Sequence, residues 1–332
     1  MKSILGGAAL ALMAFALQAP TASAQGRVTI GTNPQGSLYY TVGGGMAAAL
    51  QEAMGRQVTV QPYAGSTVYL PLVATGEVTV GINSSLDTGA VARGEYGGDG
   101  YDNLRVLARL WGLRVALASR ANDNLVEVKD LVGKRVVTDF SALKAVSLVD
   151  QTYLRAGGVE VEDVEGVTVS GLGPGMDGLT EGTLDATGIA VGIPLTQKAH
   201  ATIPGGIRYV SITGPNATSD YVNSIYPGTY IVTVEPSARL PEVTEPVNVI
   251  GYDVYLTTSA DLPDEEATAI LTALYDSFEK LREDYPPIRS GSTEMFSATS
   301  NTVPYHPAAV AFYEEKGMWT EANASNDMKV AP

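Results

Sequence analysis

The chain of 332 residues contains no cysteine and only two histidines. Without thiols it cannot form disulfide bonds, use a cysteine nucleophile or bind a metal ion through sulfur. The histidines, His200 and His306, belong to no Ser-His-Asp elbow or paired-histidine metal motif, and there is no GxxxxGK phosphate loop. We therefore expect a protein that is not an enzyme and that needs no cofactor or metal ion.

Basic residues are also scarce, since 21 Lys and Arg stand against 36 Asp and Glu and give a formal net charge of −15. Such a chain does not attract nucleic acids or anionic membranes. The longest apolar run, residues 4–17, follows Lys2 and precedes the small-residue cleavage site Ala22–Ala24. We expect residues 1–24 to be a signal peptide, with a mature periplasmic chain from about Gln25. No later stretch is apolar enough to insert into a membrane.

The first part of the mature chain repeats one pattern three times. Short strands at residues 28–30, 58–62 and 78–82 each lead into a polar loop and then a helix. Strands that alternate with helices form parallel sheets, and ligands bind beyond the carboxyl ends of such strands. The three loops are therefore expected to share one edge of a sheet.

The α/β pattern restarts after two strands, expected at residues 104–110 and 114–119. A strand at 134–140 leads to a helix that Ser141 is expected to cap and that runs through Ala156. Further strands are expected at 167–169, 184–189 and 247–257, and helices from Asp261 and over 307–316. The polar tail from Glu321 is expected to be loose.

The order of these motifs resembles one family, the TAXI (TRAP-associated extracytoplasmic immunogenic) solute-binding subunits of tripartite ATP-independent transporters. The resemblance covers nearly the whole mature chain and is most specific near the C-terminus. The segments that carry it are 30–32, 36–44, 65–66, 74–82, 130–136, 203–207, 226–230, 303–309 and 312–317.

The resemblance implies an α/β, two-lobed class II periplasmic binding protein fold with a central ligand cleft and a hinge. Lobe 1 would combine residues 25–120 and 241–332, and lobe 2 would be residues 121–240. The protein would capture a small organic acid or amino acid and deliver it to an ion-gradient-driven permease. The alternative is a receptor for a sensory or other membrane partner, of the ABC or tricarboxylate type.

One departure from the family concerns residues 138–145. The family usually has a glycine-serine-glycine-threonine turn here, which binds an acidic group through backbone N–H donors. This sequence has Phe140, Ser141 and Lys144 instead, and Lys144 could neutralise a carboxylate. If the ligand carries an amine, Asp139 could pair with it, although a solvated loop position is the simpler interpretation.

Candidate ligand-binding residues lie at the loops and helix starts of both lobes. Each also has a structural interpretation: the serines as plain helix caps, Tyr39 as a packing residue and Lys144 as a solvated helix lysine. Asn83 could bind an amide or carboxylate through both of its polar atoms. The candidates are Ser37, Tyr39, Ser66, Asn83, Ser84, Ser85, Phe140, Ser141, Lys144 and Tyr230.

Overall fold

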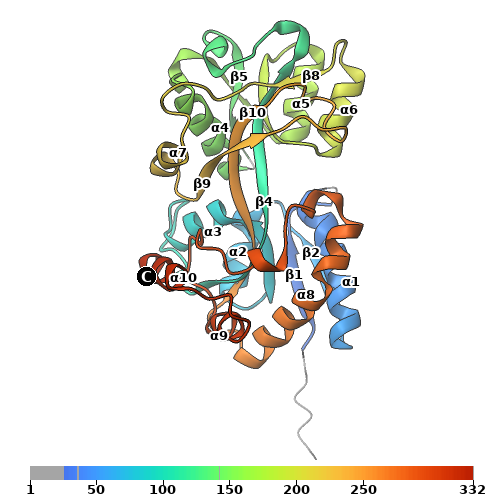
Figure 1. Ribbon diagram of the computed structural model, residues 1–332, viewed down its shortest axis with the longest axis vertical. Coiled ribbons are helices and arrows are strands. Elements are labelled where there is room, and N and C mark those ends of the chain that lie inside the picture. Colours follow the sequence, from blue (N-terminus) through green and yellow to red (C-terminus); the bar gives the residue numbers. More distant parts are fainter. Residues whose placement is uncertain (1–25, 36, 142, 332) are drawn as a thin grey trace, which may run out of the picture.

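The computed structural model describes residues 26–35, 37–141 and 143–331, so the predicted signal peptide and Gln25 lie outside the described residues. The chain forms two α/β lobes, one above the other, joined by two long strands (Figure 1). Within the described part of the chain one sheet of ten strands runs in the order β2-β1-β3-β10-β4-β7-β5-β6, with β8 beside β4 and β9 beside β10. The predicted two-lobed α/β fold is confirmed.

Lobe 1 contains the three predicted strand–loop–helix units. The parallel pairing of β1 with both β2 and β3 brings their carboxyl ends to one edge, as expected. The elements are β1 (Val28–Thr32), α1 (Leu38–Met54), β2 (Val58–Pro62), α2 (Ser66–Ala74), β3 (Val80–Ser84) and α3 (Ser85–Ala92).

Lobe 2 repeats this arrangement with a second parallel set of strands. The helix α4 begins at Lys144 with Leu143 at the N-cap position, so the prediction that Ser141 caps it was wrong. The Ser141 N–H instead donates to the Val169 carbonyl at 3.0 Å, which keeps Ser141 beside the strand edge. The elements are β5 (Arg135–Phe140), α4 (Lys144–Ala156), β6 (Glu165–Val169), α5 (Leu172–Glu181), β7 (Ala186–Ala190), α6 (Pro194–Thr202), β8 (Ile207–Tyr209), α7 (Ser219–Ile225) and β9 (Thr229–Val234).

Two antiparallel strands, β4 (Leu104–Arg120) and β10 (Val247–Ser259), run through both lobes (Figure 1). The strand β10 pairs with β3 in lobe 1 and with β9 in lobe 2. The prediction of two separate strands within 104–119 was wrong, because pairing with β10 continues through Gly112. The predicted lobe boundaries at residues 120 and 240 stay a prediction. The strands β4 and β10 each belong to both lobes, so no single residue of either strand divides them.

The C-terminal helices return to lobe 1. They are α8 (Asp264–Asp284), α9 (Pro307–Glu315) and α10 (Glu321–Val330), and short 3₁₀ helices lie at Ala121–Asp123, Val128–Leu131, Val161–Asp163, Pro286–Ile288 and Thr293–Met295. The expectation of a loose tail was wrong, because Thr320 and Asn323 form a reciprocal capping box that starts α10.

Each lobe has its own apolar core. In lobe 1, α1 and α8 pack on one face of the sheet around fully buried Trp111 and Phe278. In lobe 2, α4 packs on the sheet through Val149 and Tyr153. Burial of each large apolar side chain contributes roughly 1.5–3 kcal/mol, so each lobe is a rigid support for its loops. Among the helices of the described residues, none combines the length and apolar character that crossing a membrane requires.

Candidate functional site

A cavity of about 530 Å³ lies between the lobes. Its walls come from the start of α1, the middle of β4, the loop between β7 and α6, α6 itself, the irregular segment 237–240, and the 3₁₀ turn at 286–290 after α8. The lining residues are Leu38, Gly112, Leu113, Arg114, Val191, Gly192, Ile193, Gln197, Ser237, Arg239, Leu240, Pro286, Arg289 and Ser290. A volume in this range suits a small organic molecule.

Local structure fixes the shape of the lobe 2 wall. Gly192 has a φ of +74°, and a Cβ atom there would lie 2.6 Å from Leu240 Cδ2. Only glycine allows this positive φ and this close approach without strain. The loop before α6 therefore packs directly on the segment that carries Arg239.

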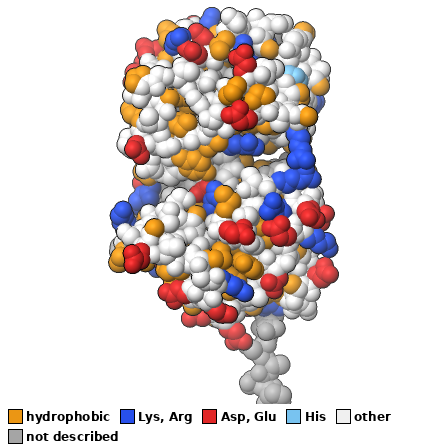
Figure 2. Space-filling view, in the orientation of Figure 1, with side chains coloured by type: hydrophobic (Ala, Val, Ile, Leu, Met, Phe, Trp, Pro, Cys, Tyr) orange, Lys and Arg blue, Asp and Glu red, His pale blue; other side chains and the backbone are white. Residues whose placement is uncertain are grey.

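Three arginines line the cavity, one from lobe 1, one from lobe 2 and one from a strand that joins the lobes. Arg114 lies in β4, Arg239 in lobe 2, and Arg289 in lobe 1 after α8. Among the residues that the structure describes, no lining residue is acidic, and none of these guanidinium groups lies within 4 Å of a carboxylate. Figure 2 shows Lys and Arg side chains along the furrow between the lobes, most densely at its right-hand end. In a chain with a net charge of −15, these three guanidinium groups give the cavity a positively charged lining.

The rest of the lining is mostly apolar. Leu38, Leu113, Ile193 and Leu240 supply aliphatic surface, and Gln197 supplies a neutral polar group. Guanidinium groups bind carboxylates through two parallel hydrogen bonds, and apolar walls accommodate a carbon skeleton. The cavity can therefore bind a small organic anion.

A second polar cluster surrounds Asp87, in the first turn of α3. The Tyr96 hydroxyl donates to Asp87 Oδ1 at 3.1 Å, and the Asp87 N–H donates to the Ser84 hydroxyl at 3.0 Å. Burial raises the pKa of Asp87, and hydrogen bonds from Ser84, Tyr96 and Ser66 oppose that rise. The net effect is a pKa of Asp87 above the usual value for an aspartate.

Tyr252, on the joining strand β10, lies opposite a residue of the cavity wall. Leu113, which lines the cavity, is the cross-strand partner of Tyr252. Directly opposed residues of an antiparallel pair share one face of the sheet. Burial, and to a lesser extent the charge of Asp87, raises the pKa of Tyr252, and Tyr39 opposes that rise.

The predicted residues Ser37, Tyr39, Ser66 and Ser84 lie near these two features. Ser37 and Ser84 are N-caps, accepting from Tyr40 N–H and Asp87 N–H. Tyr39 packs edge-on against Trp111, with ring centroids 6.1 Å apart. None of the four lines the cavity itself, although Leu38 between Ser37 and Tyr39 does.

Asn83 and Tyr230 make hydrogen bonds within the protein, and Ser85 is buried. Asn83 is fully buried and donates to Thr257 Oγ1 at 3.1 Å. The Ser85 hydroxyl is buried without a hydrogen-bond partner among the described residues. Tyr230 donates to Asp253 Oδ1 at 2.9 Å, and Asp253 also pairs with Arg109 at 2.8 Å.

The three residues of the altered turn lie away from the cavity lining. Phe140 is fully buried beside Val137. Ser141 is exposed, and Lys144 makes an exposed ion pair with Asp139 at 3.4 Å. Their binding roles stay a prediction.

Sequence reasoning missed Arg114, Arg239, Arg289 and Asp87. The arginines are far apart in the sequence and only the fold brings them together. Asp87 had a local signal, because it follows the cap residue Ser84 by three positions, where an acid favours a helix start. Within the described ranges, no group of three His, Asp or Glu side chains is placed to hold a metal ion.

The fold and the cavity between the lobes define a periplasmic solute-binding protein fold, and three solved structures share it. A TctC solute-binding protein from Polaromonas is 13% identical with a TM-score of 0.51, and the match covers 91% of this chain and 96% of that chain. MatC from Rhodopseudomonas palustris with bound malate is 17% identical with a TM-score of 0.52, over 92% of this chain and 99% of that chain. PhnD1 from Prochlorococcus marinus in complex with methylphosphonate is 12% identical with a TM-score of 0.54, over 80% of this chain and 91% of that chain. The chain belongs to the NMT1-like family, whose model matches residues 30–317.

Proposed function

We propose that this protein is an extracytoplasmic receptor of the TAXI type, which captures a small organic acid or amino acid and delivers it to an ion-gradient-driven TRAP permease. The observation that carries this proposal is the cavity between the lobes with three arginines and no carboxylate partner for them among the described residues. Two similar structures hold anions, malate and methylphosphonate, which supports the view that this fold accommodates negative charge.

Binding would use arginines from both lobes. A ligand carboxylate would accept hydrogen bonds from Arg289 on lobe 1 and Arg239 on lobe 2, with Arg114 between them on the joining strand. Because the ligand would contact both lobes only when they are close, it would favour the closed arrangement over an open one. The apolar lining would then cover the carbon skeleton and exclude water.

The permease partner follows from the resemblance to TAXI proteins and is independent of the ligand's chemistry. A gene for a fused, multi-span permease beside this one would support transport, whereas a neighbouring sensor kinase would support the receptor alternative. Transport would be tested with both components in proteoliposomes. Uptake that follows a sodium or proton gradient and requires this protein is the expected result, and ATP-dependent uptake would contradict it.

The binding proposal is tested by native mass spectrometry of the purified protein, followed by a thermal-shift screen. The panel would contain L-glutamate, L-malate, 2-oxoglutarate, citrate, neutral sugars and cationic amines. A ligand that binds the folded state raises the melting temperature by mass action, by an amount that grows with its concentration above Kd. Stabilisation by carboxylates alone is expected. Stabilisation by sugars or amines with carboxylates silent would overturn the anion proposal.

A further inference from the structure

The segment that carries Arg239 has no regular secondary structure, so other contacts must fix it. Within residues 237–243, the Leu240 N–H donates to Ser237 O at 3.0 Å and the Val243 N–H donates to Leu240 O at 2.9 Å. These bonds shape the segment but do not attach it to lobe 2. Three side chains attach it: Leu240 packs on Gly192, Glu242 accepts from Tyr209, and Val243 is buried in the lobe 2 core.

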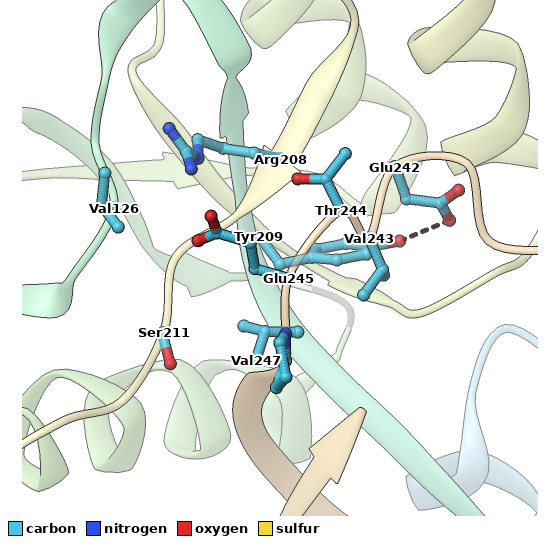
Figure 3. Close-up of a pocket in the computed structure, with 10 residues that line it drawn as sticks. Val126, Arg208, Tyr209, Ser211, Glu242, Val243, Thr244, Glu245 and Val247 are labelled. Carbon is cyan, nitrogen blue, oxygen red and sulfur yellow. Dashed lines mark hydrogen bonds between the residues drawn. The ribbon is translucent and has the colours of Figure 1, made fainter. Parts of the chain in front are cut away.

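Glu242 is an unusual residue for this position. Its side chain is only 3% exposed, and within the described part of the chain it makes no ion pair and Oε2 has no hydrogen-bond partner. Its one partner is the Tyr209 hydroxyl, which donates to Oε1 at 3.0 Å (Figure 3). Burying a carboxylate with one hydrogen bond costs free energy, so its position calls for a reason other than stability.

Tyr209 extends this contact to the cavity wall. Its hydroxyl also accepts from the Gly192 N–H at 3.3 Å, and Gly192 lines the cavity. Burial and the neighbouring Glu242 raise the pKa of Tyr209, so its hydroxyl stays protonated and can donate. A continuous chain of hydrogen bonds therefore runs from Gly192 through Tyr209 to Glu242.

We propose that Tyr209 and Glu242 are positioning residues for ligand binding. Together they hold residues 237–243 against the loop 191–193, which places Arg239 at the cavity. This inference rests on the proposed function for its effect on affinity, but its structural part, the link between the two segments, does not depend on any ligand.

The first test needs no ligand. Amide hydrogen exchange would be measured by NMR or mass spectrometry on the wild type, Tyr209→Phe and Tyr313→Phe. Tyr313 is the matched control, because it is fully buried in lobe 1 and its hydroxyl also donates one hydrogen bond, to the Leu107 carbonyl. Tyr209→Phe is expected to speed exchange at Gly192 and within 237–243 by about fivefold, the effect of one lost hydrogen bond. Equal exchange in these segments for the two variants would overturn the proposal.

The second test separates geometry from charge and uses L-glutamate and L-malate as probes. Glu242→Gln keeps an oxygen that can accept from Tyr209, whereas Glu242→Ala does not. The proposal expects Glu242→Gln to bind the probe within threefold of the wild type, and Glu242→Ala and Tyr209→Phe to bind at least fivefold more weakly. If Glu242→Gln and Glu242→Ala weaken binding equally, the carboxylate acts through its charge and the proposal is wrong. If the wild type binds no anion but Tyr209→Phe still loosens 237–243, the proposed function fails and the positioning link stands.

Discussion

The hydroxyl oxygens of Tyr96 in lobe 1 and Tyr226 in lobe 2 lie 3.1 Å apart. Tyr96 also donates to Asp87, so one hydrogen-bonded chain crosses between the lobes on the side of α3. Leu86 of the same helix packs into the lobe 2 core. The structure therefore has the lobes in direct contact, as expected of a closed arrangement.

Tyr226→Phe is expected to weaken the closed arrangement while leaving each lobe folded. One hydrogen bond contributes about 0.5–1.5 kcal/mol, so the closed population and the apparent ligand affinity should both fall, by roughly two- to tenfold. Small-angle scattering of the ligand-free protein and calorimetric titration would measure these effects. A radius of gyration and an affinity equal to those of the wild type would show that this contact does not govern closure.

Asp150→Asn is expected to remove a pH-dependent loss of stability. Asp150 is fully buried on α4 without an ion-pair partner among the described residues, and burial raises its pKa well above 3.8 against an opposing effect of the Gly188 backbone. Because the folded-state pKa lies above the unfolded-state value, stability is greatest at low pH and falls as pH rises between the two values. The loss is about 1.4 kcal/mol per unit of difference.

The measurement is urea unfolding of the wild type and Asp150→Asn at pH 5 and pH 8. The stabilising effect of the substitution should be larger at pH 8. Asp177→Asn, at an exposed position on α5, is the control and should show no such gain. A greater advantage of Asp150→Asn at pH 5 would reverse the predicted sign.

Lys144→Ala distinguishes two binding sites for the ligand's carboxylate, the altered turn at Lys144 and the arginine cavity. The sequence-based prediction, a clamp at the altered turn, expects a loss of roughly 1–3 kcal/mol in binding. In the structure Lys144 is 52% exposed, pairs with Asp139 and does not line the cavity. Because Lys144 lies outside the cavity lining and its ion pair is exposed, the arginine cavity predicts no more than about a twofold change in affinity. Titration calorimetry would measure the affinity of the variant for the ligand. A tenfold loss of affinity would place the anion site at the start of α4.

The sequence predicted the parts of the fold that depend on local pattern. The parallel strands β1, β2 and β3 and the caps Ser37 and Ser84 follow from periodicity and from side-chain chemistry at helix starts. It failed where tertiary pairing overrides local signals. Trp111 and Gly112 look like a break between strands, but β10 pairs through them and makes one strand.

The candidate site was less predictable than the fold. Arg114, Arg239 and Arg289 have no common local motif, and each alone looks like a surface arginine. Their convergence depends on how β4, the 237–240 segment and the end of α8 meet between the lobes. The serines were predictable as caps because a cap acts within its own turn.

The most direct test of an anion site between the lobes is calorimetric titration of Arg239→Gln and Arg289→Gln with the strongest carboxylate from the thermal-shift panel. Arg155→Gln, at a half-buried position on α4 that pairs with Glu160, is the matched control. Each cavity variant is expected to lose about 1.5–3 kcal/mol of binding free energy, at least tenfold in Kd, with no loss in the control. Binding by both cavity variants as tight as that of the wild type would contradict the proposed site.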